Sequence, residues 1–157
     1  GTPDRLADVC RELSVQGVPR CGDDVFNALR IAAGFPLQGI DLTEEHLAQE
    51  SGRKQQAISF TKGCYLGQEP IARLETLGHT NRELRRIALE SEQFPAPGAR
   101  VTDAATGVEL GCVTSAASLP IERHAVALAM LRREAWTPGT AILVECPLEL
   151  ARGTVLG

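Results

Sequence analysis

The 157-residue sequence has no apolar run of the length, about 18 residues, that a membrane-spanning helix needs. Its N-terminus lacks the charged-then-apolar pattern of a secretory signal. An excess of positive charge is also missing, because the net charge is −4 at pH 7 and only two of the 16 cations are lysines, Lys54 and Lys62. These absences predict no membrane partner and no nucleic-acid partner.

Paired cysteine motifs are missing as well. The five cysteines are odd in number and widely spaced, with no C-x-x-C among them: Cys10, Cys21, Cys64, Cys112 and Cys146. A disulfide framework or a zinc site is therefore not expected, and a reducing cytoplasm is the predicted setting. What remains is an ordinary globular composition, with 43% apolar and 23% charged residues, and enough chain for one good core or two small ones.

The character of the chain changes near Asn81. Before it, capping residues and apolar periodicity predict helices over residues 3–16, 23–33 and 68–77, a short buried strand over 56–60, and a helical turn or surface loop over 43–51. After it, strands are predicted over 86–90, 99–102, 109–114, 124–129, 141–145 and 151–155. Short strands at this spacing are typical of a small antiparallel barrel. The predicted fold class is α+β, with residues 1–80 an α/β portion and 81–157 a closed antiparallel β-barrel.

One stretch, Lys62–Glu69, combines several unusual features and reads K-G-C-Y-L-G-Q-E. Gly63 and Gly67 bracket a tight turn, where a side chain would obstruct a positive φ or a close backbone approach. An acidic residue and a proline then open a helix. Cys64 falls between the predicted strand and this helix, close to Lys62, and both the helix N-terminus and the cation favour a thiolate. The residues alone leave two readings open: a reactive cysteine, or a structural turn with a small buried cysteine.

The octapeptide resembles the K-G-C-[FY]-x-G-Q-E signature of YgfZ-type folate-binding proteins, relatives of the glycine-cleavage T-protein (GcvT, aminomethyltransferase). Ala28–Pro36 resembles the family's "LRI-x-AG-x-P", Gly39–Leu42 its "G-x-D", and the resemblance continues through the barrel. It implies a GcvT/YgfZ-like folate-binding region followed by the barrel. It also implies tetrahydrofolate as the cofactor and a role in iron–sulfur cluster assembly or repair, with iron–sulfur client proteins as partners.

Two departures from the aminomethyltransferase pattern favour the YgfZ branch. Aminomethyltransferases usually read R-x-E-A-G, with the glutamate lining the folate pocket, and this chain has Ala32 there. They also have F-I-G where this chain has Cys64–Gly67. Two alternatives stay open, a working aminomethyltransferase and a non-catalytic interaction barrel, so enzymatic activity is left undecided. Family members are roughly twice as long. The resemblance therefore implies either a C-terminal fragment or a truncated member, and we expect it to bind folate weakly or not at all on its own, because part of the family's ring around the folate channel is absent.

Cys64 is the candidate catalytic residue. The residues expected to orient its turn are Lys62, Gly63, Tyr65, Gly67, Gln68 and Glu69. A guanidinium fork matches a carboxylate, so Arg73 and Arg82 are the candidates for binding the folate glutamate tail. Arg30 is a further candidate for folate binding. No metal ligand is assigned, since an iron–sulfur cluster normally takes four thiolates. Of the other cysteines, Cys112 and Cys146 are expected in buried strand contexts, and Cys10 on the inner face of its helix.

Overall fold

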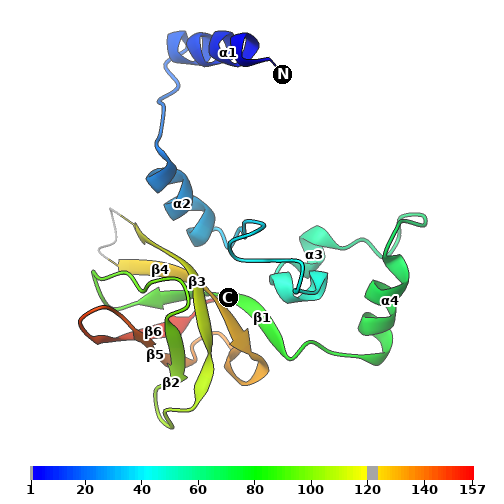
Figure 1. Cartoon of the computed structure of the whole chain (residues 1–157), viewed down its shortest axis with the longest axis vertical. Coiled ribbons are helices and arrows are strands. Elements are labelled where there is room, and N and C mark those ends of the chain that lie inside the picture. Colours follow the sequence, from blue (N-terminus) through cyan, green and yellow to red (C-terminus); the bar gives the residue numbers. More distant parts are fainter. Residues whose placement is uncertain (1, 120–123) are drawn as a thin grey trace.

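Six antiparallel strands in the C-terminal half close into a barrel in the computed structural model, which describes residues 2–119 and 124–157. The order around the barrel is β1-β4-β3-β2-β5-β6 (Figure 1). The strands are β1 Arg82–Leu89, β2 Arg100–Asp103, β3 Glu109–Leu119, β4 His124–Arg132, β5 Ala141–Glu145 and β6 Leu150–Val155. The predicted barrel is confirmed, and each predicted strand overlaps an observed one.

Every second side chain of a strand points into the barrel and fills its interior, because successive side chains of a strand point to opposite faces. The interior core is apolar throughout and includes Ile87, Leu89, Val101, Val113, Leu131, Ile142, Val144 and Val155. A second cluster lies on the outer wall, where Leu84, Leu128 and Met130 pack against Ile31. Residues 125–131 of β4 are therefore buried on both faces, which explains their unbroken apolar sequence.

The helices lie before the barrel in sequence. They are α1 Pro3–Val15, α2 Asp23–Ala32, the 3₁₀ turn η1 Ala48–Ser51, the short α3 Lys54–Ala57 and α4 Gln68–Leu77; a further 3₁₀ turn, η2 Arg133–Ala135, follows β4. The predicted α2 and α4 are confirmed to within one residue. α2 lies against the outer wall of the barrel and supplies Ile31 to the second cluster (Figure 1). Within the described residues, no helix is long and apolar enough to cross a membrane.

α1 differs from the expectation in its packing. A helix forms where predicted, with Pro3 in its first turn and Gly17 just beyond its end at φ +78°. However, none of its residues is buried, and Cys10, expected on an inner face, is exposed. α1 stands away from the barrel at the end of an extended segment (Figure 1).

The predicted strand over 56–60 is wrong. Residues 54–57 form α3, and the chain then bends, with Ile58 buried and Phe60 exposed. A short apolar run cannot be told from a helix end by pattern alone, and Lys54 with its two glutamines favours a helical turn. The Lys54 ammonium lies 5.9 Å from the centre of the Phe60 ring, which places the aromatic side chain beside α3 rather than in a core.

The 43–51 segment forms a helical turn at η1, yet its last residues do not lie on the surface. Gln49, Glu50 and Ser51 are buried despite their polarity. The Gln49 amide donates to the Ile71 carbonyl of α4 at 3.0 Å, and Glu50 pairs with Arg82. Partners from distant parts of the chain satisfy these groups, which is what allows polar side chains to be buried.

Candidate functional site

The K-G-C-Y-L-G-Q-E turn leads directly into α4. Gly67 is the N-cap of that helix, with φ +84°, and the Gln68 N–H donates to the Tyr65 carbonyl at 3.2 Å. The expected need for glycine therefore holds at Gly67, where a side chain would be strained. It does not hold at Gly63, whose φ is not in the left-handed region and where an added Cβ would meet nothing within 4 Å.

The turn presents Cys64 on the surface rather than in a core. The Cys64 side chain is exposed, so the alternative in which Cys64 is a small buried residue of a structural turn is wrong about its burial. The Lys62 ammonium lies 4.3 Å from the centre of the Tyr65 ring, a cation–π contact between residues on either side of Cys64 in the sequence. The Lys62 N–H donates to Ser59 Oγ at 3.2 Å, which fixes the start of the turn. The motif thus leaves the Cys64 thiol accessible in the turn that precedes α4.

Exposure by itself does not distinguish Cys64 from the other thiols. Cys10, Cys21 and Cys112 are exposed too, so the expected burial of Cys112 is wrong. Cys112 lies in β3 with its side chain on the outer wall of the barrel. Its apolar neighbours in the sequence, Leu110 and Val113, belong to the interior core. Cys146 is half-buried, and burial, followed by the charge of Glu149, raises the pKa of its thiol.

Arg73 lies beside a cavity of about 610 Å³ between α4 and the segment 46–49. Its lining is largely apolar and includes Leu47, Ile71 and Leu74, with the exposed Arg73 among them. His46 also lines this cavity, and its Nδ1 accepts from the Thr43 N–H at 3.0 Å. The cavity thus joins an apolar wall to a cationic side chain. Cys64 is not among its lining residues.

Arg82 does not lie at that cavity and instead bonds to the chain itself. Its Nε donates to Glu50 Oε1 at 3.1 Å, and its Nη2 donates to the Glu45 carbonyl at 3.4 Å. The Glu50 side chain is buried, whereas that of Arg82 is about half exposed. These bonds join the first residue of β1 to η1, so the sequence-predicted Arg73 and Arg82 are not brought together at one cavity.

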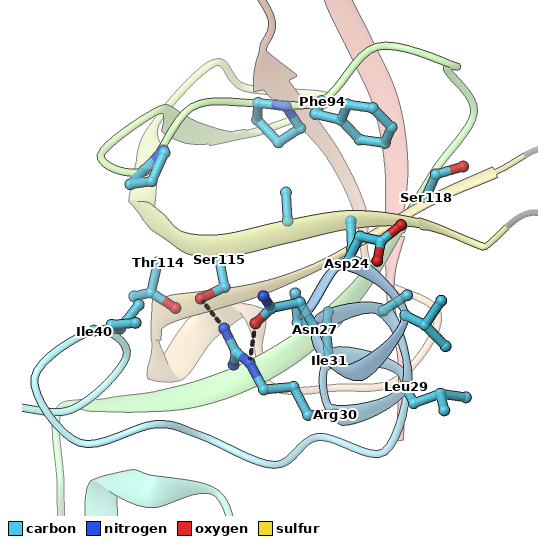
Figure 2. Close-up of a pocket in the computed structure, with 16 residues that line it drawn as sticks. Asp24, Asn27, Leu29, Arg30, Ile31, Ile40, Phe94, Thr114, Ser115 and Ser118 are labelled. Atoms are coloured by element: carbon cyan, nitrogen blue, oxygen red, sulfur yellow. Dashed lines mark hydrogen bonds between the residues drawn. The ribbon is translucent and has the colours of Figure 1, made fainter. Parts of the chain in front are cut away.

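Arg30 enters a buried polar cluster between α2 and the barrel. Its Nη1 donates to Asp41 Oδ2 at 2.7 Å. Its Nη2 donates to Ser115 Oγ at 2.9 Å and its Nε to Asn27 Oδ1 at 2.8 Å (Figure 2). Asp41 is only 1% exposed and accepts three more hydrogen bonds, from the hydroxyls of Thr114 and Ser115, each at 2.6 Å, and from the Leu37 N–H at 2.9 Å. The guanidinium is thus directed at protein groups.

Sequence reasoning missed this cluster, although Arg30 and Asp41 both stood in stretches singled out above. Arg30 and Asp41 belong to the "LRI" and "G-x-D" matches, and Ser115 lies 85 residues after Arg30. No local pattern pairs residues at that separation. The one signal in the sequence was chemical. A charged side chain that becomes buried needs a partner of opposite charge, so an arginine in an apolar helix and an aspartate in the following turn-rich stretch were candidates for a pair.

Comparison with known proteins places these features in a family. No family model matches the sequence. An aminomethyltransferase of Saccharopolyspora erythraea is 33% identical over 130 residues, which is 82% of this chain and 35% of that protein. A tRNA-modifying protein YgfZ of Colwellia psychrerythraea is 38% identical over 77 residues, 48% of this chain and 24% of that protein. These matches support a place for the chain in the superfamily of aminomethyltransferases and YgfZ proteins.

A solved structure supports the same fold. The glycine cleavage system aminomethyltransferase T from Bartonella henselae superposes with a TM-score of 0.72 at 22% identity, covering 83% of this chain and 36% of that one. This likeness establishes the GcvT fold for the matched region. The chain spans about a third of the length of the aminomethyltransferases that it matches. Within residues 2–119 and 124–157, no group of three or more His, Cys, Asp or Glu is placed to hold a metal ion.

Proposed function

We propose that this protein is a tetrahydrofolate-binding protein of the YgfZ type, which assists the assembly or repair of iron–sulfur enzymes. The observation that carries the proposal is the K-G-C-Y-L-G-Q-E turn, in which Cys64 is exposed in the segment that leads into α4. An accessible cysteine in the turn before a helix, with a lysine two residues earlier in the sequence, is the context in which a reactive thiol is expected. Five free cysteines fit a reducing, cytoplasmic setting.

In this proposal Arg73 is the arginine that contacts the folate glutamate tail. Its side chain is exposed at the edge of an apolar cavity, where a ligand with an aromatic body and an acidic tail finds both kinds of contact. Arg30 and Arg82 take another role, because their guanidinium groups are bonded to Asp41 and Glu50. We assign these two as positioning residues that hold α2 and η1 against the barrel.

A second candidate is aminomethyl transfer, and one observation favours it. The Saccharopolyspora aminomethyltransferase aligns with 82% of this chain, whereas the Colwellia YgfZ aligns with 48%. Against it stands Ala32, the residue at the position of the folate-lining glutamate. Its methyl group offers no hydrogen bond to a ligand, and its carbonyl already accepts from Arg86 Nη1 at 2.6 Å. We therefore expect no transfer of an aminomethyl group from a lipoyl carrier to tetrahydrofolate.

The YgfZ relatives carry the name tRNA-modifying protein, which bears on the expectation of no nucleic-acid partner. Nucleic-acid binding rests mainly on a cationic surface, and this chain has a net charge of −4. We therefore place the contribution of these 157 residues at the folate and thiol chemistry rather than at an RNA surface.

Complementation tests the proposal. In a bacterium deprived of its own YgfZ-type protein, the complete product of the reading frame that encodes these residues should restore the activity of an iron–sulfur enzyme. Cys64→Ser should abolish that restoration. Cys112→Ser is the matched control, since it removes an equally exposed thiol outside the motif and should leave restoration intact. Equal restoration by Cys64→Ser and the unaltered protein would contradict the proposed role of the thiol and favour the interaction barrel.

A further inference from the structure

The Cys64 turn belongs to a loop whose two ends are joined by an ion pair. Lys54, the first residue of α3, pairs with Glu75 near the end of α4, 21 residues later in the sequence. The segment between them contains the whole K-G-C-Y-L-G-Q-E turn and most of α4. A bond between the ends of a loop restricts the residues that it encloses. The pair is therefore placed to control how far the turn moves.

Lys54 interacts with two further parts of the chain. Its ammonium lies 5.9 Å from the centre of the Phe60 ring, within the range of a cation–π contact, and Phe60 lies between α3 and the turn. On the side of the barrel, burial raises the pKa of the Glu83 carboxyl of β1, and the charges of Arg85 and Lys54 partly offset that rise. Lys54 thus interacts with α4, with the segment before the turn, and with β1.

A second bond reaches α4 from η1. The Gln49 side chain is 7% exposed, and its amide donates to the Ile71 carbonyl. The next residue, Glu50, is bonded to Arg82 at the start of β1. Consecutive residues of one 3₁₀ turn therefore connect the barrel to α4. Within the described residues, Gln49 and Lys54 are the side chains that bond to α4 from outside the helix.

α4 connects these bonds to the proposed folate and thiol chemistry. Cys64 lies in the turn before the helix, and Arg73 lies on the helix two residues before Glu75. α4 stands beside α3 (Figure 1). A movement of α4 relative to α3 therefore displaces both the thiol and the guanidinium. Both partners of each bond belong to the described part of the chain.

We propose that Lys54 is a positioning residue for Cys64 and Arg73, and that it acts through its ion pair with Glu75. This inference rests on the proposed function, but the closure of the loop can be measured without it. The side chains of the pair are 45% and 34% exposed. Exposed pairs contribute little to global stability, so the effect of this one should appear in the loop and not in the unfolding of the barrel.

Hydrogen exchange of the complete product of the reading frame tests the closure. Lys54→Glu and Glu75→Lys each place like charges at the ends of the loop. The amides of α4 should then exchange at least about threefold faster, and those of the barrel strands should keep their rates. Combining the two substitutions restores an opposite-charge pair and should recover most of the slow exchange. Recovery should not be complete, because the contacts of Lys54 with Phe60 and Glu83 stay lost.

Arg100→Glu is the matched control. It reverses one charge of a similarly exposed pair, that of Arg100 with Glu145 in the barrel, and should leave the exchange of α4 unchanged. Unchanged exchange of α4 in both single variants would overturn the proposal. A combined variant that exchanges as fast as the single ones would overturn it as well, since the two residues would then act separately.

Restoration of an iron–sulfur enzyme, in the complementation assay described above, measures the consequence for the site. Lys54→Glu and Glu75→Lys should each lower the restored activity at least about threefold, and their combination should recover it. Full activity in single variants whose α4 exchanges faster would overturn the positioning role. If the unaltered protein itself restores nothing, the proposed function fails and the role of Lys54 at that site fails with it. The exchange rates would still show whether the pair closes the loop.

Discussion

At the scale of single residues, the contact between α2 and the barrel depends on Asp41. This carboxylate is 1% exposed and accepts from Arg30, from the Leu37 N–H at 2.9 Å, and from two hydroxyls of β3. The charge of Arg30 is buried with it, its side chain being 5% exposed. A buried ion pair with all of its hydrogen bonds made is costly to break on one side only, because the remaining charge is left without a partner.

Asp41→Ala should lower the free energy of unfolding by about 3–5 kcal/mol, measured by urea denaturation. Asp8→Ala is the control, because it removes the partner of Arg11 in an exposed pair and should cost at most about 1 kcal/mol. Replacing both buried partners, as in Arg30→Met with Asp41→Leu, should recover much of the loss. A cost at Asp41 no larger than that at Asp8 would show that the buried pair does not hold α2 in place.

Cys64 should be the most reactive of the five thiols. Its side chain is exposed, and it stands in the K-G-C-Y-L-G-Q-E turn that leads into α4. Burial raises the pKa of Cys146, which should therefore react slowly. Graded alkylation at neutral pH, with the modified cysteines located by mass spectrometry, measures the order. Modification of Cys21, Cys10 or Cys112 well before Cys64 would leave Cys64 an ordinary exposed cysteine in a turn.

At the scale of elements, the barrel depends on one glycine in β3. Gly111 has φ +151° and faces β4 so closely that an added Cβ would overlap the Met130 carbonyl oxygen. The overlap is with backbone, which cannot move aside without breaking the strand pairing around Gly111 and Leu131.

Gly111→Ala should therefore destabilise the barrel by at least about 3 kcal/mol, the range of the more severe single substitutions. Gly139→Ala separates the effect of overlap from that of conformation alone. Gly139 has φ +90° and open space around it. Its replacement by alanine should therefore cost only about 1–2 kcal/mol, the cost of placing a side chain on left-handed backbone. Thermal unfolding of both variants measures the difference. Equal losses would show that backbone conformation, not close packing against β4, makes Gly111 necessary.

The turn between β2 and β3 gives a pH-dependent prediction. Asp103 Oδ1 accepts from the Thr106 hydroxyl at 2.8 Å, the Thr106 N–H at 2.7 Å and the Ala105 N–H at 3.0 Å. These bonds, above all the Thr106 hydroxyl, lower the pKa of Asp103 below its ordinary 3.8. Because the pKa of Asp103 is lower in the folded state than in the unfolded state, the ionised carboxylate stabilises the fold above pH 3.8. This stabilisation is lost as the pH falls through the lowered pKa.

Asp103→Asn should accordingly lower stability at neutral pH and make the acid side of the stability profile less steep. Denaturant unfolding repeated between neutral pH and pH 3 measures both effects. Glu44→Gln, a substitution on an exposed carboxylate outside the turn, serves as the control. A variant profile parallel to that of the unaltered protein would show that Asp103 contributes no proton linkage.

The elements also show what the sequence could predict and what it could not. The barrel strands and α2, α4 were predictable because period-2 alternation and capping residues are local signals. The strand expected at 56–60 failed because a five-residue apolar run has no period of its own. The burial of Gln49 and Glu50 was not predictable, since their partners Ile71 and Arg82 lie 22 and 32 residues away.

At the scale of the whole molecule, the candidate site was predictable only where its parts are contiguous. The turn around Cys64 was located from its own residues. The three arginines were grouped by charge, but the fold places Arg30 in a buried cluster, Arg82 against η1 and Arg73 at a cavity beside α4. Which arginine stays exposed depends on contacts between distant segments, and no single stretch of sequence encodes that.

Calorimetric titration with tetrahydrofolate tests the central claim, that this is a folate-binding protein of the YgfZ type, most directly. The complete product of the reading frame should bind with a Kd in the micromolar range. The 157-residue chain alone should bind at least about tenfold more weakly, a difference of about 1.4 kcal/mol. Arg73→Ala should weaken binding by the complete product, and Arg100→Ala, on an exposed arginine of the barrel, should not. The absence of any binding to the complete product would contradict the claim.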